Sequence, residues 1–155
     1  MESLIQNNTW NLYDLPVDGK VIPTKWVFRI KKNSDGSIEK YKARLVAKGF
    51  RQCYVIDYSD IFSPVAKFGT VRSILSIAAS ENLHLVQFDV STAFLYCELK
   101  EIIYIKQPEG FHDGTSKICE LKKSLFGLKQ SSRCWNIRFH NFLISLGFHQ
   151  SEEIE

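Results

Sequence analysis

The alternation of hydrophobic and polar residues predicts a β-hairpin in the first third of the chain. Residues 25–31 and 38–47 are rich in aromatic and β-branched side chains, which favour β-strands. Between them, residues 33–36 read Asn-Ser-Asp-Gly, and an Asp-Gly pair between such runs is a strong signal for a hairpin turn. We therefore expect two antiparallel strands joined by a tight turn.

Apolar residues at helical spacing predict two helices further along. One covers residues 71–79, and the other runs from about residue 132 to residue 146. In the second helix, aromatic and leucine side chains form a single apolar stripe. Gly147 follows directly and would end this helix.

Three further segments are predicted to be strands. Residues 83–90 are mostly apolar, as in a strand covered on both faces. Residues 102–106 and 117–122 read as two shorter strands separated by a loop. A hairpin, a helix, strands and a final helix together predict an α+β domain.

Composition fits one globular domain and excludes a membrane span. The 155 residues are 45% hydrophobic and 24% charged, which is typical of a folded chain. No run approaches the roughly 20 apolar residues that a span requires, and residues 1–11 do not resemble a signal peptide. We therefore expect an intracellular protein with no membrane partner.

The four cysteines lack the spacing of a zinc site. They stand at positions 53, 97, 119 and 134, without a closely spaced pair. We expect buried free thiols in a reducing compartment.

Positive charge gathers in two blocks, residues 20–51 and 117–138, although the net charge is only +3. On the predicted strand 38–47, side chains alternate between two faces, so Lys40, Lys42 and Arg44 would share one face. Three neighbouring cations repel one another unless an anion lies against them, which suggests a triphosphate or a nucleic-acid backbone. A solvated basic strand without a ligand is the alternative.

Asp89 is the carboxylate best placed for chemistry. It stands at the end of the predicted strand 83–90, where a strand meets a loop. An aspartate there is well placed to hold Mg²⁺, which prefers oxygen ligands. The alternative is that Asp89 only caps the amides of the following turn.

Several segments, in this order and at this spacing, resemble the reverse transcriptase domain of copia-type LTR retrotransposons. The segments that carry the resemblance are 42–50 (Lys-Ala-Arg-Leu-Val-Ala-Lys-Gly-Phe), 56–58 (Ile-Asp-Tyr), 62–67 (Phe-Ser-Pro-Val-Ala-Lys), 87–95 (Gln-Phe-Asp-Val-Ser-Thr-Ala-Phe-Leu), 104 with 107–111 (Tyr; Gln-Pro-Glu-Gly-Phe), 123–130 (Lys-Ser-Leu-Phe-Gly-Leu-Lys-Gln), Arg133 with Trp135, and 146–148 (Leu-Gly-Phe). Each segment alone is a weak signal, but the whole series is specific and covers nearly the entire chain.

The resemblance implies a role for each matching residue. Asp89 corresponds to the first catalytic aspartate, a ligand of Mg²⁺. Phe94 corresponds to the aromatic residue that excludes a 2′-hydroxyl, Lys42 and Arg44 to cations that hold the triphosphate, and Gln130 to a glutamine beside the nucleotide. The implied partners are an RNA or DNA template-primer and a deoxynucleoside triphosphate.

The resemblance also implies a partial right-hand polymerase fold. Residues of about 20–80 would form the fingers, with their β-hairpin. Residues of about 81–155 would form part of the palm sheet with packed helices and returning fingers segments. The whole chain, 1–155, would then be a truncated reverse transcriptase domain.

The sequence departs from the family pattern at three short sites, and an acidic residue that the family shows soon after Leu-Gly-Phe is absent at Ile154, which lies outside the residues that the structure describes. Tyr96-Cys97 replaces an Asn-Gly pair, Val55 replaces a glycine, and Ser131-Ser132 replaces a pair that ends in proline. Two of these changes remove glycine from turns that would need a positive φ, at about 1 kcal/mol or more each.

The Tyr-Val-Asp-Asp motif of the family does not occur in the 155 residues. Tyr54-Val55-Ile56-Asp57 resembles it but has one carboxylate and precedes Asp89, so we reject it as a substitute. Two-metal phosphoryl transfer requires converging carboxylates, so Asp89 alone forms an incomplete site. We expect a fragment inactive on its own; the alternatives are a non-catalytic nucleic-acid-binding remnant and an unstable pseudogene-like fragment without function. Exposed palm strands would favour self-association.

Overall fold

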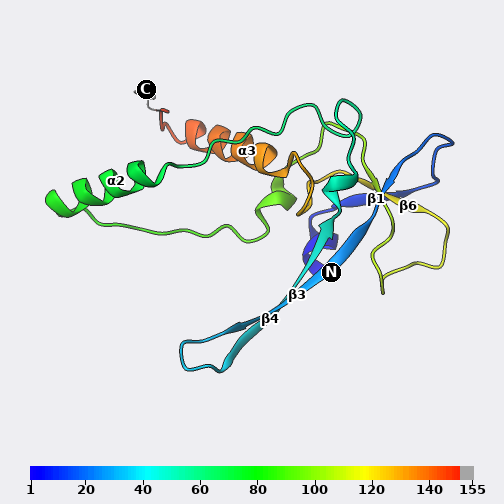
Figure 1. The fold of residues 1–155 in the computed structure, drawn as a ribbon, viewed down its shortest axis with the longest axis horizontal. Helices are drawn as coiled ribbons and strands as arrows, with labels where there is room; N and C mark the ends of the chain where they lie inside the picture. Colours follow the sequence, from blue (N-terminus) through cyan, green and yellow to red (C-terminus); the bar gives the residue numbers. More distant parts are fainter. Residues whose placement is uncertain (151–155) are drawn as a thin grey trace.

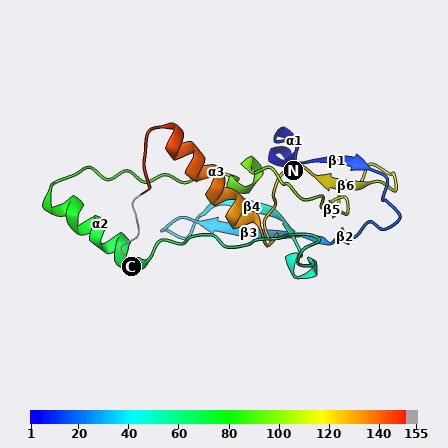
Figure 2. The same cartoon turned by 90° about the horizontal axis from the view of Figure 1, so that it is seen from above.

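The computed structural model of the protein describes residues 1–150. These residues combine two β-sheets with three α-helices, which confirms the expected mixture of helices and strands. The molecule is elongated: the larger sheet lies toward one end and helix α2 (Phe68–Ser80) forms the other (Figures 1 and 2). None of the described helices is both long and apolar enough to cross a membrane.

The larger sheet has four short strands, in the spatial order β1 (Trp10–Tyr13), β6 (Ile118–Leu121), β5 (Tyr104–Ile105) and β2 (Val21–Ile22). Strand β6 pairs antiparallel with β1 and with β5, while β2 and β5 run parallel. The predicted strands 102–106 and 117–122 are thus confirmed, with shorter bounds. Strands β1 and β2 and the short helix α1 (Glu2–Gln6) were not predicted.

The predicted hairpin is confirmed as strands β3 (Thr24–Lys32) and β4 (Ile38–Ala47). Its turn closes where the Gly36 amide donates to the Asn33 carbonyl oxygen at 3.0 Å. Gly36 has a φ of +86°, which glycine adopts without the steric cost that a Cβ would add. The hairpin projects away from the rest of the molecule (Figure 1).

Both predicted helices are present. Helix α2 begins three residues before the predicted segment 71–79, and two long connecting segments without helix or strand join it to the body (Figure 1). Helix α3 (Ser131–Ser145) ends before Gly147, whose φ of +87° provides the expected stop. The apolar stripe of α3 is largely uncovered: Phe142 is 56% exposed.

The predicted strand 83–90 is wrong. Residues 83–90 adopt neither strand nor helix, and all eight are exposed. An apolar run favours a strand only where a neighbouring strand can pair with its backbone. Within residues 1–150, no strand lies beside this segment.

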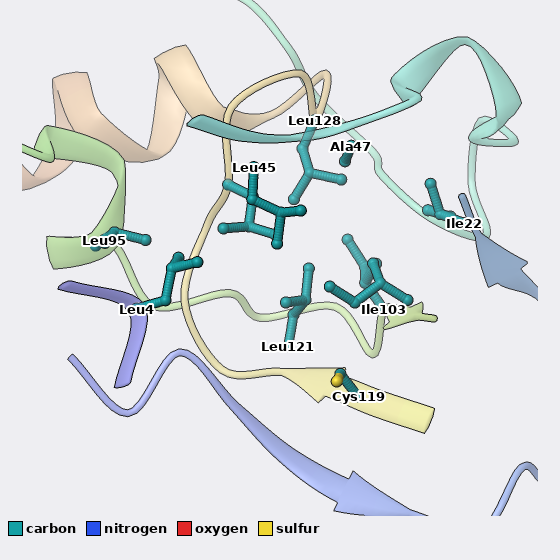
Figure 3. Close-up of a cluster of buried hydrophobic side chains, with 11 residues drawn as sticks. Leu4, Ile22, Leu45, Ala47, Leu95, Ile103, Cys119, Leu121 and Leu128 are labelled. Atoms are coloured by element: carbon teal, nitrogen blue, oxygen red, sulfur yellow. The ribbon is translucent and has the colours of Figure 1, made fainter. Parts of the chain in front are cut away.

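The hydrophobic core lies where the base of the hairpin meets the four-stranded sheet and the segment around residue 125 (Figure 3). Leu45 of β4 and Ile105 of β5 contribute to it from different sheets. The core is small, and many large apolar side chains remain exposed elsewhere among the described residues.

The expectation of buried free thiols is confirmed for Cys97 and Cys119. Burial raises the pKa of Cys97 to about 11 and that of Cys119 to about 12. Cys134 is half-buried, and Cys53 is exposed. The expectation is therefore wrong for Cys53, which lies in a surface loop outside the core.

Two glycines hold the end of β4 against the turn that precedes α3. The Ala47 amide donates to the Phe126 carbonyl oxygen at 2.7 Å. A Cβ on Gly127, whose φ is +88°, would overlap the Ala47 carbonyl oxygen, and a Cβ on Gly49 would overlap the Gly127 carbonyl oxygen. Glycine at both positions thus permits a backbone-to-backbone approach that places Phe126 beside β4.

Val55 confirms one of the two expected strained turns. Its φ is +71°, a conformation that is unusual for a β-branched residue. Its amide donates to the Tyr58 carbonyl oxygen at 2.8 Å, which closes a tight loop. The other expectation is wrong, because Cys97 has a φ of −103° and needs no glycine.

Candidate functional site

The β3–β4 hairpin carries a face of five cations. The register places Arg29 opposite Lys42 and Lys31 opposite Lys40, while Arg44 lies two residues beyond Lys42 on the same face. Three of these side chains, Lys40, Lys42 and Arg44, were predicted from the alternation along the strand. Arg29 and Lys31 join them through cross-strand pairing. The opposite face of the hairpin is apolar and aromatic and includes Phe28, which is 75% exposed.

These cations act on one another. The positive charge of Arg44 is the main cause that lowers the pKa of Lys42, followed by desolvation and the charges of Lys31 and Lys40. Among the described residues, neither Lys42 nor Arg44 forms an ion pair with a carboxylate. An anion placed against this face would relieve the repulsion.

Three aromatic and cationic side chains from separate segments meet at the base of the hairpin. The Arg44 guanidinium carbon lies 5.4 Å from the centroid of the Phe126 ring. The Phe126 ring in turn meets the Phe94 ring edge to face, with centroids 4.8 Å apart. Phe94 lies in the 3₁₀ helix η2 (Ala93–Tyr96), which Thr92 introduces with a φ of +56°. The structure therefore brings two predicted site residues, Arg44 and Phe94, into contact with the same ring, that of Phe126.

Asp89 is exposed and precedes η2. Its negative charge raises the pKa of Lys42, although less than the neighbouring cations lower it, so the two predicted residues lie within electrostatic range. Within residues 1–150, no three His, Cys, Asp or Glu side chains gather to hold a metal ion. Asp89 can thus offer one carboxylate ligand, but the described residues do not form a complete magnesium site.

Gln130 lies apart from this group, in a buried hydrogen-bond network. Its Nε2 donates to the Asp57 carbonyl oxygen at 2.9 Å, and its Oε1 accepts from Gln52 Nε2 at 2.9 Å. Gln52 Oε1 accepts from the Lys129 amide at 2.8 Å. Both polar ends of the Gln130 side chain are therefore occupied by protein groups, and only 2% of the residue is exposed.

Asp57, which belongs to the rejected Tyr-x-x-Asp segment, has a structural environment. Its Oδ2 accepts from Lys20 Nζ at 2.7 Å and from the Cys53 amide at 2.6 Å. The hydrogen bond to Asp57 is the main cause that raises the pKa of Lys20. Asp57 thus links the loop at residues 53–58 to the chain before β2.

Three of the six cations in the second basic block have partners within the molecule. Lys123 pairs with Glu98 at 2.8 Å, and Arg133 pairs with Asp60 at 3.0 Å. Lys129 lies over the Tyr58 ring, 5.0 Å from its centroid. These contacts leave the hairpin face as the better candidate for binding an anion.

A cleft of about 1170 Å³ lies between η2, β6 and α3. Of the predicted site residues it includes only Gln130, whose amide is already engaged. Cations and carboxylates both line the cleft, so its charge favours neither sign of ligand.

Comparison with known proteins gives one consistent result. A family model described as reverse transcriptase (RNA-dependent DNA polymerase) matches residues 7–155. The chain is 50% identical over 147 residues to the retrovirus-related Pol polyprotein from transposon TNT 1-94 of Nicotiana tabacum, which covers 94% of the chain and 11% of that protein. It is 41% identical over 150 residues to the corresponding polyprotein from transposon RE1 of Arabidopsis thaliana, which covers 95% of the chain and 10% of that protein.

A more distant relative comes from yeast. The chain is 36% identical over 155 residues to the truncated transposon Ty1-A Gag-Pol polyprotein of Saccharomyces cerevisiae, which covers 93% of the chain and 12% of that protein. The chain thus spans about a tenth of the length of these curated relatives. No solved structure matches it.

Proposed function

Because this chain belongs to the reverse transcriptase (RNA-dependent DNA polymerase) family, we propose that it is the nucleotide- and template-binding part of the polymerase of a retrotransposon Pol polyprotein. In this proposal, residues of about 20–80 form the fingers, and residues of about 81–155 form part of the palm with returning fingers segments. Lys42, Arg44 and Phe94 contact the incoming nucleotide, and Asp89 is a metal ligand. Gln130, whose side chain is buried and bound to protein groups, supports the neighbouring loops from the buried side.

The observation that carries the proposal is the cationic face of the hairpin. The five positive side chains lie on one face of two paired strands, and Lys40 has a carboxylate partner, Glu39, at 3.5 Å. Such a cluster is costly to leave without further counter-charge, and a phosphate backbone or a triphosphate supplies it. The same arrangement favours the second candidate function, a nucleic-acid-binding module without chemistry.

A salt titration tests the binding. An RNA–DNA hybrid oligonucleotide is bound to the unchanged chain and to the double variant Lys42→Gln/Arg44→Gln, and affinity is measured by fluorescence anisotropy at several salt concentrations. Each phosphate contact contributes roughly one unit to the slope of log affinity against log salt, so the double variant should lose about one to two units. The matched control is Lys106→Gln/Lys117→Gln, which removes two exposed lysines that flank strands β5 and β6 of the four-stranded sheet and should leave the slope unchanged. Binding that does not depend on salt would argue against the proposal.

Catalysis is proposed to require more than these 155 residues. Asp89 is one carboxylate, and the sequence holds no Tyr-x-Asp-Asp motif to supply the others. Members of this family generally use divalent metal ions, but a single carboxylate ligand does not fit a two-metal clamp. Template-dependent primer extension by the isolated 155 residues, with Mg²⁺ or Mn²⁺ added, would overturn this part of the proposal.

Self-association is proposed through the exposed apolar segment 83–90, although this segment forms no strand. Phe88 is 85% exposed and Val86 is 71% exposed, and exposed apolar groups in one segment favour association. Sedimentation velocity should show a size that grows with concentration, and Val86→Ser/Phe88→Ser should reduce that growth. A broad thermal melt that lacks a cooperative transition would instead favour the unstable-fragment alternative.

A further inference from the structure

We propose that Phe126 is a positioning residue of the nucleotide site, through which the fold fixes both Arg44 and Phe94. This inference rests on the proposed function, since it concerns how the two proposed nucleotide-binding side chains are held. Neither the spacing of the motifs nor the family resemblance pointed to Phe126, which is a member of the segment 123–130 without an assigned role.

The first step is that the backbone of Phe126 is fixed independently of its ring. Its carbonyl oxygen accepts from the Ala47 amide at 2.7 Å, and residue 126 forms an isolated bridge with Val46 at the end of β4. The close approach at Gly127 secures the same turn. A substitution of the side chain alone should therefore leave the turn docked.

The second step is that the ring contacts the two proposed nucleotide-binding side chains at once. The Arg44 guanidinium carbon lies 5.4 Å from the ring centroid, within the range of a cation–π interaction. The Phe94 ring meets Phe126 with an interplanar angle of 67° and centroids 4.8 Å apart, a favoured geometry for an aromatic pair. Arg44 comes from the hairpin and Phe94 from η2, so the Phe126 ring links these two proposed nucleotide-binding side chains across elements.

The third step is that both contacts restrict positions that matter for recognition. A guanidinium held over a ring keeps its donors aimed in one direction, which favours paired hydrogen bonds to a phosphate group. The Phe94 ring can exclude a 2′-hydroxyl only if it stays in place, because ribose and deoxyribose differ by that oxygen alone. Loss of the Phe126 ring should therefore weaken triphosphate binding and also reduce the preference for deoxyribose.

Gln130 takes a different place in this arrangement. Its side chain holds the loop at Asp57 and, through Gln52, the Lys129 amide. Gln130 lies four residues after Phe126, so its buried hydrogen bonds hold the turn before α3 from the inside. The half-buried ring of Phe126 holds the same turn from the side that contacts Arg44.

The test is a nuclear magnetic resonance titration of the ¹⁵N-labelled 155-residue chain with dATP and, separately, with ATP. Phe126→Leu keeps an apolar side chain of similar volume but removes the ring, and Phe126→Tyr keeps the ring. We expect Phe126→Leu to bind dATP about fivefold more weakly and to lose most of the preference for dATP over ATP, whereas Phe126→Tyr should behave like the unchanged chain. The amide spectrum of each variant shows directly whether the turn remains folded.

A matched control separates this effect from the general loss of an aromatic pair. Phe139→Leu on α3 removes a ring stacked on Trp135 at a centroid distance of 5.7 Å, an aromatic pair that includes none of Arg44, Phe94 and Phe126, and should change neither affinity nor preference. An unchanged ratio of dATP to ATP affinity in Phe126→Leu would overturn this inference alone. Failure of the unchanged chain to bind dATP would overturn the proposed function and this inference with it.

Discussion

Val55 offers a sharp test of the fold, because it holds a backbone conformation that its side chain disfavours. Its φ is +71°, in the left-handed region where a β-branched residue is a genuine outlier. The conformation is imposed by the loop, since the Val55 amide donates to the Tyr58 carbonyl and the Asp57 amide donates to the Cys53 carbonyl. Replacement by glycine, Val55→Gly, should remove the strain and keep both hydrogen bonds.

The magnitude follows from three contributions. Relief of strain at a non-glycine residue in this region gives about 1–3 kcal/mol, and a β-branched residue belongs near the upper end. Val55 is 75% exposed, so the burial that is lost is about a quarter of a full valine, or roughly 0.5 kcal/mol. The freedom that glycine adds to the unfolded chain costs about 0.5–1 kcal/mol. The net expectation is a gain in unfolding free energy of about 1 kcal/mol.

The assay is equilibrium unfolding in urea, followed by tryptophan fluorescence and by circular dichroism to check that the two transitions coincide. A gain of 1 kcal/mol should also raise the melting temperature by about 2–4 °C in a chain of this size. Two further variants isolate the cause. Val55→Ala keeps a Cβ at the strained position, so it should not reproduce the gain. Val65→Gly replaces a valine that is 86% exposed and has no positive φ, so it should lose about 0.5–1 kcal/mol.

Two outcomes would refute the reasoning. If Val55→Ala stabilises the chain as much as Val55→Gly, the gain comes from removing an exposed apolar side chain and not from the backbone. If Val55→Gly destabilises the chain as much as Val65→Gly, then the left-handed conformation carries no strain that glycine can release.

Three other predictions follow from the buried contacts and the loops. Gly127→Ala should lower the unfolding free energy, measured in urea, by about 1–3 kcal/mol more than Gly110→Ala does. Both glycines have a positive φ, but only a Cβ on Gly127 would meet backbone atoms. Equal losses would contradict the close approach between Gly127 and Ala47. Gln130→Leu should cost about 2–4 kcal/mol in the same measurement, because it removes two buried hydrogen bonds and leaves Gln52 Nε2 and the Asp57 carbonyl oxygen with only the long 3.5 Å hydrogen bond between them. A loss below about 0.5 kcal/mol would count against the network. Hydrogen bonds to the Asp113 carboxylate, that from Gln107 first, lower the pKa of Asp113 to about 2. The stabilisation of the folded loop by these bonds should therefore be present above pH ~4 and be lost as the pH falls toward 2. Hydrogen exchange should show this as a loss of protection of the amides of residues 113–115 at low pH, and Asp113→Asn should abolish that pH dependence.

The sequence predicted those elements whose signals are local. The Asp35-Gly36 pair marked the hairpin turn, and Gly147 marked the end of α3, because each acts through its own backbone. Strands β1 and β2 were not predicted, because they are short and pair with strands that are distant in the sequence. Trp10 pairs with Leu121, and Val21 pairs with Tyr104. Residues 83–90 show the opposite error, since their apolar pattern predicted a strand that no neighbour within the described chain supports.

The candidate site was predicted in part for a related reason. Alternation along one strand identified the cations of β4, but only the register of the hairpin shows that Arg29 and Lys31 share their face. The family resemblance pointed to Phe94 and Arg44 separately. The contact that joins them is made by Phe126, and nothing in the spacing of the motifs indicates which side chain of the segment 123–130 faces outward.

The motif residues therefore divide into two groups with different expected consequences. Gly49, Gly127 and Gln130 are buried or in close backbone contact, so changes at these positions should act on stability. Lys42 and Arg44 remain partly accessible on the hairpin, so changes there should act on binding while the fold persists. Phe126 connects the groups: its carbonyl belongs to the packed backbone and its ring to the accessible side, which is why replacement of its ring alone can separate recognition from folding.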